Sequence, residues 1–446
     1  FLFGLAALLT PCVFPMIPMT VAFFTNDKQS RGEARVKALF YGFSIIAIYI
    51  LIGLVFTSFF GVGLANELAT GAIPNIIFFT VFLIFAISFF GYFEINLPNG
   101  FINKMDRKTE KGGLLGVFFM AFTLVLVSFS CTGPIVGTVL IQPFQGEVMK
   151  PVVGMLGFSS AFAIPFTVFA FFPGLLKSLP KSGGWLNTVK VVLGFIELAL
   201  GFKFLSIADQ AYHWGILDRE IFIAIWFLLA LGLALYLFGL IRFPHDDKKA
   251  SLGIGRLGLG VSALAFSVYL FTGLAGANLN ALAGYLPPIK QTDFSFQVAL
   301  GLEDPPERAK VAPEAFNGVV KHADFLELPH DLKGFFDYDQ ALSFAKQVEK
   351  PLFIDFTGHG CVNCRKMEQN VWSDPRVLNL LRNEFVIVAL YIDDKTELPE
   401  EDWYTSTFDG RVKKTVGKQN FDFQIVKFNG NAQPYYVLLD NEEQLL

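Results

Sequence analysis

The sequence predicts an α-helical membrane domain of eight spans, built from inverted three-helix repeats and followed by a water-soluble α/β domain. Hydrophobic residues make up 53% of the 446 residues, which is too many for a soluble protein of this size. The apolar runs end near residue 275, and the charge changes there. Residues 1–275 carry 18 basic and 13 acidic residues, whereas residues 276–446 carry 17 and 26. We expect no nucleic-acid binding by this acidic part.

Eight apolar segments are long enough to cross a bilayer, which takes about 20 residues per helix. Their connections alternate in charge, since the odd-numbered ones are rich in Lys and Arg. Because basic loops stay in the cytoplasm, we expect both ends of the membrane domain, and the soluble part, on the opposite side. The predicted spans cover residues 2–24, 38–60, 74–93, 114–140, 151–173, 187–207, 221–241 and 253–275.

The membrane domain contains an internal repeat. The stretch around Cys12 matches the stretch around Cys131, and Gly42-Phe43-Ser44 matches Gly157-Phe158-Ser159. Three spans followed by three more of opposite direction form an inverted pair, and the functional site of such a pair lies near the middle of the membrane. This symmetry predicts that the two cysteines lie close together.

Both membrane cysteines stand beside helix-breaking prolines. Cys12 lies between Pro11 and Pro15, and Pro134 follows Cys131 by three residues. Proline interrupts a helix, and unwound backbone is tolerated at membrane depth only where it is buried in protein or lines a watery cavity. Thiol-disulfide exchange needs such a place, because the attacking species is a thiolate anion. We therefore favour a redox pair over two inert buried thiols, the usual state of a free cysteine.

The soluble part is expected to begin with a connector over residues 276–333, which contains two Pro-Pro pairs and shows little regular pattern. The domain that follows, residues 334–446, alternates helical and strand patterns. Its expected elements are a helix over 339–348, a strand over 351–356, a helix beginning at Cys361-Val362-Asn363-Cys364, a helix over 375–383, and strands over 385–392 and 435–439.

The Cys361–Cys364 motif lies between a strand and a helix, a position that favours redox chemistry because a helix N-terminus lowers a thiol's pKa. We expect Cys361 to be the nucleophile and Cys364 the resolving thiol. Asp355, in the preceding strand, and Glu368, one turn past the motif, are candidate proton relays. A plain structural role is the alternative for each carboxyl.

No metal site is predicted at this motif. Zinc would need two further ligands, and the histidines of the soluble part, His322, His330 and His359, show no ligand spacing. His359 could favour the Cys361 thiolate electrostatically. The alternative is that it is an exposed loop residue.

These motifs resemble the DsbD family of transmembrane thiol:disulfide interchange proteins. The match is specific over residues 10–18 and 355–368. The resemblance implies an electron-transfer domain over residues 1–275 and a thioredoxin-like fold over residues 334–446. It also implies that Pro434 is the cis-proline beside the active site.

The resemblance further implies a direction of electron flow. Electrons would pass from cytoplasmic thioredoxin to Cys12 and Cys131, then to Cys361 and Cys364, and on to periplasmic disulfide-bonded proteins. Neither a metal nor an organic cofactor is implied. The protein would be a multi-pass protein of a bacterial inner membrane, in contact with lipid, with its thioredoxin-like domain in the periplasm. Acceptors in cytochrome c maturation, or a peroxidase, would fit.

The sequence departs from the family pattern in places. Ser130 stands where many relatives have proline, so the bend must come from Gly133 and Pro134. No N-terminal immunoglobulin-like domain is found, and the chain opens at Phe1 inside an apolar run, so we expect a missing N-terminal segment. We also expect the thioredoxin-like domain to be incomplete at its C-terminus, because a strand and helix normally follow the last strand.

Two other functions are compatible with parts of the sequence. A quinone-linked oxidase that makes disulfides usually carries cysteine pairs in loops outside the membrane, and no such loop pair occurs here. A solute transporter with a redox-sensing tail would need a polar substrate site, and the centres of the spans lack a polar cluster. The sequence therefore favours a protein-disulfide reductase.

Overall fold

The computed structural model describes most of the soluble domain and about half of the membrane domain. The longer described ranges are residues 36–51, 70–93, 149–171, 183–244, 253–288 and 315–446, and the shorter pieces are 4, 32, 116–119, 121–122, 124–125, 246 and 312–313. The chain falls into two compact units, which we describe separately. Unit 1 comprises Phe1–Ala69, Thr80–Leu198 and Gly239–Gly253, and unit 2 comprises Thr70–Phe79, Ala199–Phe238 and Ile254–Leu446.

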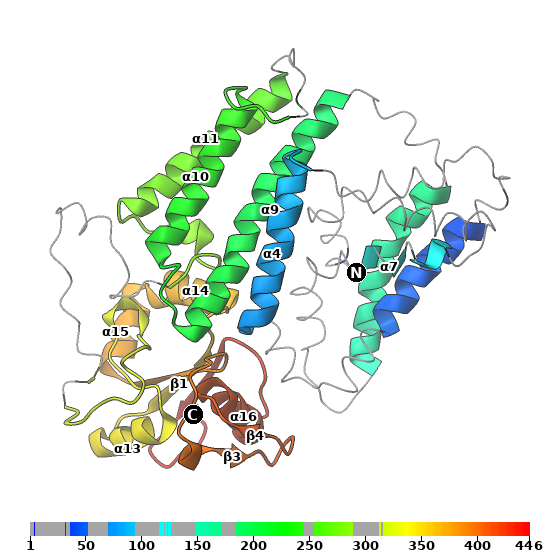
Figure 1. Cartoon of the computed structure of the whole chain (residues 1–446). Helices are drawn as coiled ribbons and strands as arrows, with labels where there is room; N and C mark the ends of the chain where they lie inside the picture. Colours follow the sequence, from blue (N-terminus) through cyan, green and yellow to red (C-terminus); the bar gives the residue numbers. More distant parts are fainter. Residues whose placement is uncertain are drawn as a thin grey trace. The chain divides into compact units, whose positions relative to one another are not determined.

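Four described helices are long and apolar enough to cross a membrane (Figure 1). They correspond to the third, sixth, seventh and eighth predicted spans. Shorter apolar helices cover Val36–Leu51 and Val153–Pro165, in the second and fifth predicted spans. The first and fourth predicted spans lie largely outside the described residues, so the number eight stays a prediction. The four long helices are α4 (Ala72–Phe89), α9 (Gly183–Tyr212), α10 (Arg219–Leu237) and α11 (Ile254–Leu274), and Val153–Pro165 lies within α7 (Met149–Phe171).

Within unit 1, the described helices pack through aromatic rings and glycines. Tyr49 of the helix Val36–Leu51 meets Phe158 of α7 edge-on, with ring centroids 5.6 Å apart. Phe90, just after α4, lies against Phe195 of α9 at 4.9 Å. Gly194 permits this approach, because a Cβ there would lie 3.0 Å from the Phe90 ring.

Within unit 2, the helices share an apolar core. Phe222 and Trp226 of α10 pack with Leu270 of α11 and with Leu286 of the segment after it. The Trp226 indole N–H donates to the Ala199 carbonyl of α9 at 3.1 Å, which satisfies its one polar atom. α9 ends five residues beyond the predicted span. Its last turns contain polar side chains that are buried in the fold, and a search for apolar residues cannot detect these.

The domain after the connector is built on a three-stranded sheet in the order β2-β1-β5. The central strand β1 (Leu352–Thr357) runs parallel to β2 (Val386–Tyr391) and antiparallel to β5 (Tyr435–Leu439). Every residue of β2 is buried, as expected for a strand covered on both faces. The helix α13 (Tyr338–Val348) packs on this sheet, and the Asp337 side chain caps its first turn.

The expected helices and strands of the soluble domain are confirmed to within about two residues. The pattern did not predict α16 (Val416–Phe428) or the short hairpin before it. The described part of the connector contains only two 3₁₀ turns, η1 and η2. The other elements are η1 (Asn280–Leu282), η2 (Pro329–Asp331), α14 (Val362–Met367), the π-helical turn η3 (Glu368–Trp372), α15 (Pro375–Asn383), η4 (Glu400–Asp402), β3 (Tyr404–Thr405) and β4 (Val412–Lys413).

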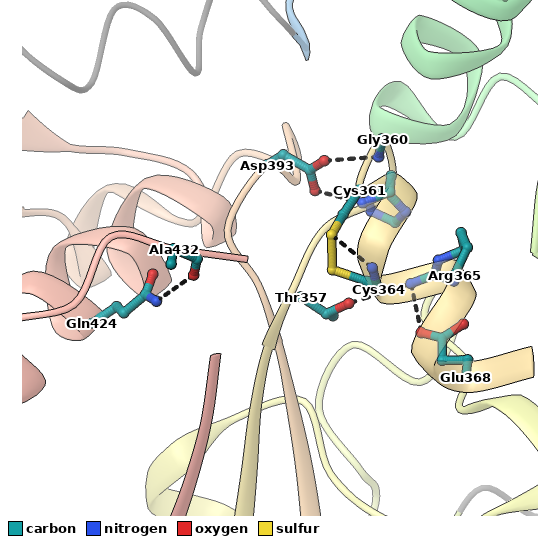
Figure 2. The surroundings of a disulfide bond; sticks show 10 residues. Thr357, Gly360, Cys361, Cys364, Arg365, Glu368, Asp393, Gln424 and Ala432 are labelled. Atoms are coloured by element: carbon teal, nitrogen blue, oxygen red, sulfur yellow. Dashed lines mark hydrogen bonds and ion pairs between the residues drawn. A yellow bond between two sulfur atoms is a disulfide. The ribbon is translucent and has the colours of Figure 1, made fainter. Parts of the chain in front are cut away.

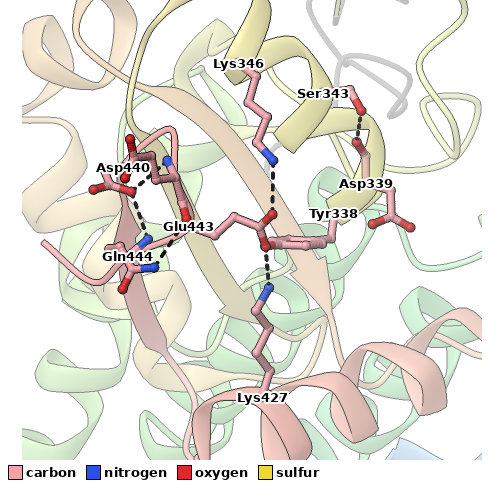
Figure 3. Close-up of polar contacts among 9 residues, drawn as sticks. Tyr338, Asp339, Ser343, Lys346, Lys427, Asp440, Glu443 and Gln444 are labelled. Atoms are coloured by element: carbon pink, nitrogen blue, oxygen red, sulfur yellow. Dashed lines mark hydrogen bonds and ion pairs between the residues drawn. The ribbon is translucent and has the colours of Figure 1, made fainter.

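The last residues fold back onto the domain (Figure 3). Leu445 pairs with Leu439 of β5. The Glu443 carboxylate accepts from Lys346 of α13 at 3.1 Å and from Lys427 of α16 at 3.0 Å. It also accepts from the Tyr338 hydroxyl at 3.0 Å. These hydrogen bonds, from Lys427 above all, lower the pKa of Glu443 to about 2.

Candidate active site

Cys361 and Cys364 form a disulfide at the start of α14, with their Cα atoms 5.3 Å apart (Figure 2). Cys361 is the N-cap residue, and its Sγ accepts from the Cys364 backbone N–H at 3.1 Å. Cys364 is 1% exposed, whereas Cys361 is partly exposed. An incoming thiolate can therefore reach only the first sulfur, and the helix N-terminus stabilises negative charge on it.

The loop between β1 and this disulfide is fixed by one buried carboxylate. Asp393 Oδ1 accepts from the His359 backbone N–H at 2.8 Å, and its Oδ2 accepts from that of Gly360 at 3.0 Å. Gly358 leaves the room for this contact, since a Cβ there would lie 2.8 Å from Asp393 Oδ2. The Gly-His-Gly sequence thus positions Cys361 through its backbone.

Pro434 follows a cis peptide bond with Gln433, as the resemblance implied. The Gln424 side chain of α16 holds this segment by donating to the Ala432 carbonyl at 2.9 Å (Figure 2). A Cβ at Gly358 would also lie 2.8 Å from Gln433 Oε1. The cis-proline segment therefore borders the loop that leads into the disulfide.

A buried group of charged side chains surrounds the start of α14. Arg365 pairs with Glu368 at 2.7 Å and donates to the Thr357 hydroxyl at 3.3 Å (Figure 2). Asp355, in β1, is 2% exposed. Burial raises the pKa of Asp355 well above its usual range, and the charge of Glu368 raises it further against the opposing effect of Arg365. Burial also raises the pKa of Glu368, although Arg365 opposes it.

This arrangement can hold a proton on a carboxyl group at a pH where exposed acids are ionised. One carboxyl comes from the strand that leads into the motif, and the other from the turn that follows α14. Reducing the disulfide creates a thiolate that needs a proton. The predicted relay residues Asp355 and Glu368 thus have a protonation behaviour suited to that task.

A second polar cluster includes His359 of the same loop. The Asp394 Oδ2 atom bonds the Nε2 atoms of His213 at 2.8 Å and of His359 at 3.0 Å. Its Oδ1 accepts from the Thr396 backbone N–H at 2.8 Å. His359 is 3% exposed and its ring stacks on Tyr391. The alternative of an exposed loop histidine is therefore wrong, because this side chain is enclosed by Asp394 and Tyr391.

The three ligand-type atoms of His213, His359 and Asp394 lie within 4.8 Å of one another. Two imidazoles and a carboxylate could bind a divalent metal ion. In the structure, however, one oxygen serves both rings at hydrogen-bond distances, whereas metal ligands surround a common point. The geometry fits a hydrogen-bonded cluster better than a metal centre.

The predicted membrane site cannot be examined in the same way. Cys12 and Cys131, with Pro11, Pro15 and Pro134, lie outside the described residues. Their proximity stays a prediction.

Sequence reasoning missed several residues of the site, among them Asp393, whose carboxylate holds the loop before the disulfide. Arg365 follows Cys364 directly, so its charge beside the motif could have been noticed. Asp394 follows a buried strand, at an edge where functional side chains often gather. His213 had no signal, because 181 residues separate it from Asp394.

Comparisons with known proteins agree with this architecture. Residues 1–207 match the family of cytochrome c biogenesis protein transmembrane domains, and residues 332–440 match the thioredoxin-like family. The chain is 27% identical to the thiol:disulfide interchange protein DsbD of Pseudoalteromonas atlantica over 85% of its length. It is 28% identical to that of Vibrio vulnificus over 86%, and 27% identical to that of Campylobacter jejuni over 85%.

The chain is therefore similar to the DsbD proteins over most of its length. It combines a DsbD-type transmembrane domain with a C-terminal thioredoxin-like domain, so it is a multi-pass membrane protein. It spans 57%, 57% and 59% of the length of these three DsbD relatives, less than two thirds of each.

Proposed function

We propose that this DsbD relative is a transmembrane thiol-disulfide reductase, which moves reducing equivalents from cytoplasmic thioredoxin to periplasmic disulfide-bonded proteins. The observation that supports this proposal most strongly is the Cys361–Cys364 disulfide at the start of α14. The same chain also matches a DsbD-type transmembrane domain. The matched relatives are named thiol:disulfide interchange proteins.

The soluble half of the reaction follows from the exposure of the two sulfurs. A thiolate of the membrane pair attacks Cys361 Sγ and forms a mixed disulfide, while the Cys361–Cys364 bond breaks and Cys364 leaves as a thiolate. The second membrane thiol then attacks the mixed disulfide, forms the membrane disulfide and releases Cys361. Two electrons have moved to the soluble domain. Its dithiol next reduces an acceptor disulfide by the same steps in reverse order.

Asp355 and Glu368 are assigned to proton transfer in this step. Cys364 is almost fully buried, so the thiolate that it forms is costly until it gains a proton. A carboxyl whose pKa is raised by burial can donate that proton and later take it back. Pro434, in the segment beside the Gly358 loop, is assigned to substrate alignment.

Cys12 and Cys131 are assigned as the membrane pair, with Pro11, Pro15 and Pro134 opening the helices around them. The packing of the described helices supports an inverted repeat of three plus three spans. The helix Val36–Leu51 packs on α7, which carries the matching Gly-Phe-Ser motif. The third and sixth predicted spans also pack together, since Phe79 of α4 contacts Phe202 of α9. Pairwise contact of equivalent spans is expected at a pseudo-twofold axis.

The remaining assignments complete the proposal. Residues 1–275 form the eight-span electron-transfer domain, residues 276–333 the connector and residues 334–446 the thioredoxin-like domain. The protein lies in a bacterial inner membrane with the last domain in the periplasm, and the cysteine pairs carry the electrons without an added cofactor. Acceptors of the cytochrome c maturation class fit this position.

Trapping of mixed disulfides tests the reductase function. Cys364→Ala removes the resolving thiol, so acceptor proteins should accumulate in covalent complexes on Cys361, visible by non-reducing electrophoresis and mass spectrometry. The matched variant Cys361→Ala keeps one cysteine but should trap none, because Cys364 is buried. Equal trapping by both variants, or by neither, would contradict the assigned roles.

A further inference from the structure

We propose that His213, Asp394 and His359 form a latch that docks the active-site face of the thioredoxin-like domain on the end of α9. The inference rests on the proposed function in one respect, because the latch would position the domain within the electron relay. All of its residues belong to unit 2.

The first side of the latch is a turn held rigidly at the end of α9. Asp209, in the last turns of that helix, accepts from the backbone N–H groups of Ile216 at 2.9 Å and Leu217 at 3.1 Å. His213 lies inside this turn with φ +55°, in the left-handed region that few residues adopt. The turn therefore holds the His213 imidazole in a fixed direction. The left-handed backbone at this residue costs conformational free energy, which an ordinary loop would avoid.

The second side is built from the loops that carry the active site. His359 lies two residues before Cys361, and Asp394 follows Asp393, whose carboxylate holds that loop. Burial raises the pKa of Asp394, but the hydrogen bonds from His213 and His359 outweigh it and hold the pKa well below its usual range. An ionised carboxylate that accepts two imidazole N–H groups makes stronger hydrogen bonds than a neutral acceptor.

Further contacts join the thioredoxin-like domain to α9 and to the segment after α11, beside the latch. The Lys395 backbone N–H donates to the Ala211 carbonyl of α9 at 3.1 Å. A Cβ on Gly360 would lie 3.2 Å from the Ile207 side chain. After α11, a Cβ on Gly284 would lie only 2.6 Å from a methyl group of Val362, so the backbone there approaches the start of α14 closely.

These contacts place α9 and the segment after α11 against Gly360 and Val362, the neighbours of the partly exposed Cys361 in the sequence. A soluble acceptor can reach the sulfur freely only when the latch opens. The cluster thus sets the balance between a docked and a released domain, and a substitution that weakens it shifts that balance.

Hydrogen exchange of the Lys395 amide reports on the latch directly. In the purified full chain, oxidised and without any electron donor, His213→Ala should speed exchange at Lys395 by about 10- to 100-fold. Asp394→Asn, which keeps an acceptor oxygen but loses the charge, should have a smaller effect. The amides of β1 and β2 should exchange as in the parent, which shows that the domain remains folded.

His322→Ala is the matched control, because this histidine lies in the connector before the domain and has no hydrogen bond to Asp394 among the described contacts. It should leave Lys395 exchange unchanged. Unchanged exchange in His213→Ala would overturn the latch. One zinc ion per purified chain, lost in His213→Ala, would overturn it in favour of a metal site. Because no electron transfer occurs in this experiment, its failure is distinguishable from failure of the reductase function.

Discussion

Two groups of charged side chains in the thioredoxin-like domain invite comparison. Beside the disulfide, Arg365 and Glu368 pair at 2.7 Å with side chains only 3% and 6% exposed. Near the end of the chain, Glu443 pairs with Lys346 and Lys427 at 3.1 and 3.0 Å, with about a third or more of each side chain exposed. The distances are similar, but the surroundings differ.

The difference teaches that burial and pairing shift a carboxyl pKa in opposite directions, and that burial prevails at Glu368 whereas the hydrogen bonds prevail at Glu443. The pKa of Glu368 is raised although a guanidinium touches it, whereas the pKa of Glu443 falls to about 2. Water solvates the exposed Glu443 carboxylate, and its ion pairs with Lys346 and Lys427 stabilise the ionised form further. The buried carboxylate loses more solvation than its partner restores. The buried group therefore holds its proton to a higher pH than an exposed glutamate does, and it lies at the redox motif.

The largest expected effect comes from removing the buried cation. Arg365→Met should lower the free energy of unfolding of the domain by about 3–5 kcal/mol, because Glu368 would remain buried without a partner. Urea unfolding of the full chain in detergent, followed by pulse proteolysis, measures this. Arg376→Met is the exposed control, since that arginine pairs with Asp374 at the surface. A loss as small as that of the control would show that the buried pair contributes nothing.

A smaller effect, with a distinctive pH dependence, is expected at Asp355. Its folded pKa is raised, so its stability contribution is full below the ordinary value near 4 and is lost as the pH rises toward the folded pKa. Asp355→Asn cannot ionise. It should equal the parent in stability below about pH 4 and exceed it increasingly above, by up to about 1.4 kcal/mol per pH unit. Parallel stability curves would show that Asp355 has an ordinary pKa.

The smallest effect is expected at the exposed group, with the opposite sign of pH dependence. The pKa of Glu443 is lowered, so its contribution is present above the ordinary pKa of about 4.5 and is lost as the pH falls toward about 2. Glu443→Gln should cost about 0.5–1 kcal/mol at pH 7 and little at pH 2, and added salt should reduce the cost. Thermal unfolding at two salt concentrations measures it. If Glu443→Gln lowered the free energy of unfolding by more than Arg365→Met does, the exposed ion pairs would matter more than the buried one, contrary to this account.

Local pattern was enough to predict much of this domain. The apolar run of β1 and the Cys361–Cys364 motif at a helix start depend on neighbours in sequence, whereas the cis-proline before β5 was implied only by the resemblance to the DsbD family. The helix α16 was missed because its apolar residues are mixed with polar ones that become buried only in the folded domain, such as Asp422 and Gln424. Burial of that kind is decided by tertiary packing, which no local window contains.

The same limit applies to the candidate site. The cysteines could be found from their motif, but the contact of His213 with Asp394 depends on how α9 meets the thioredoxin-like domain. His359 was weighed as an exposed residue because the Gly-His-Gly sequence is typical of an open loop. The structure instead closes the loop over the Asp393 carboxylate.

The central claim is that the membrane pair supplies the electrons that reduce Cys361 and Cys364. The redox state of that dithiol in cells, measured by thiol alkylation with a mass tag, tests this claim in Cys12→Ser and Cys131→Ser variants. We predict that both variants keep the Cys361–Cys364 pair oxidised while cytoplasmic thioredoxin stays reduced. A pair that remains as reduced as in the parent protein would contradict the relay through the membrane cysteines.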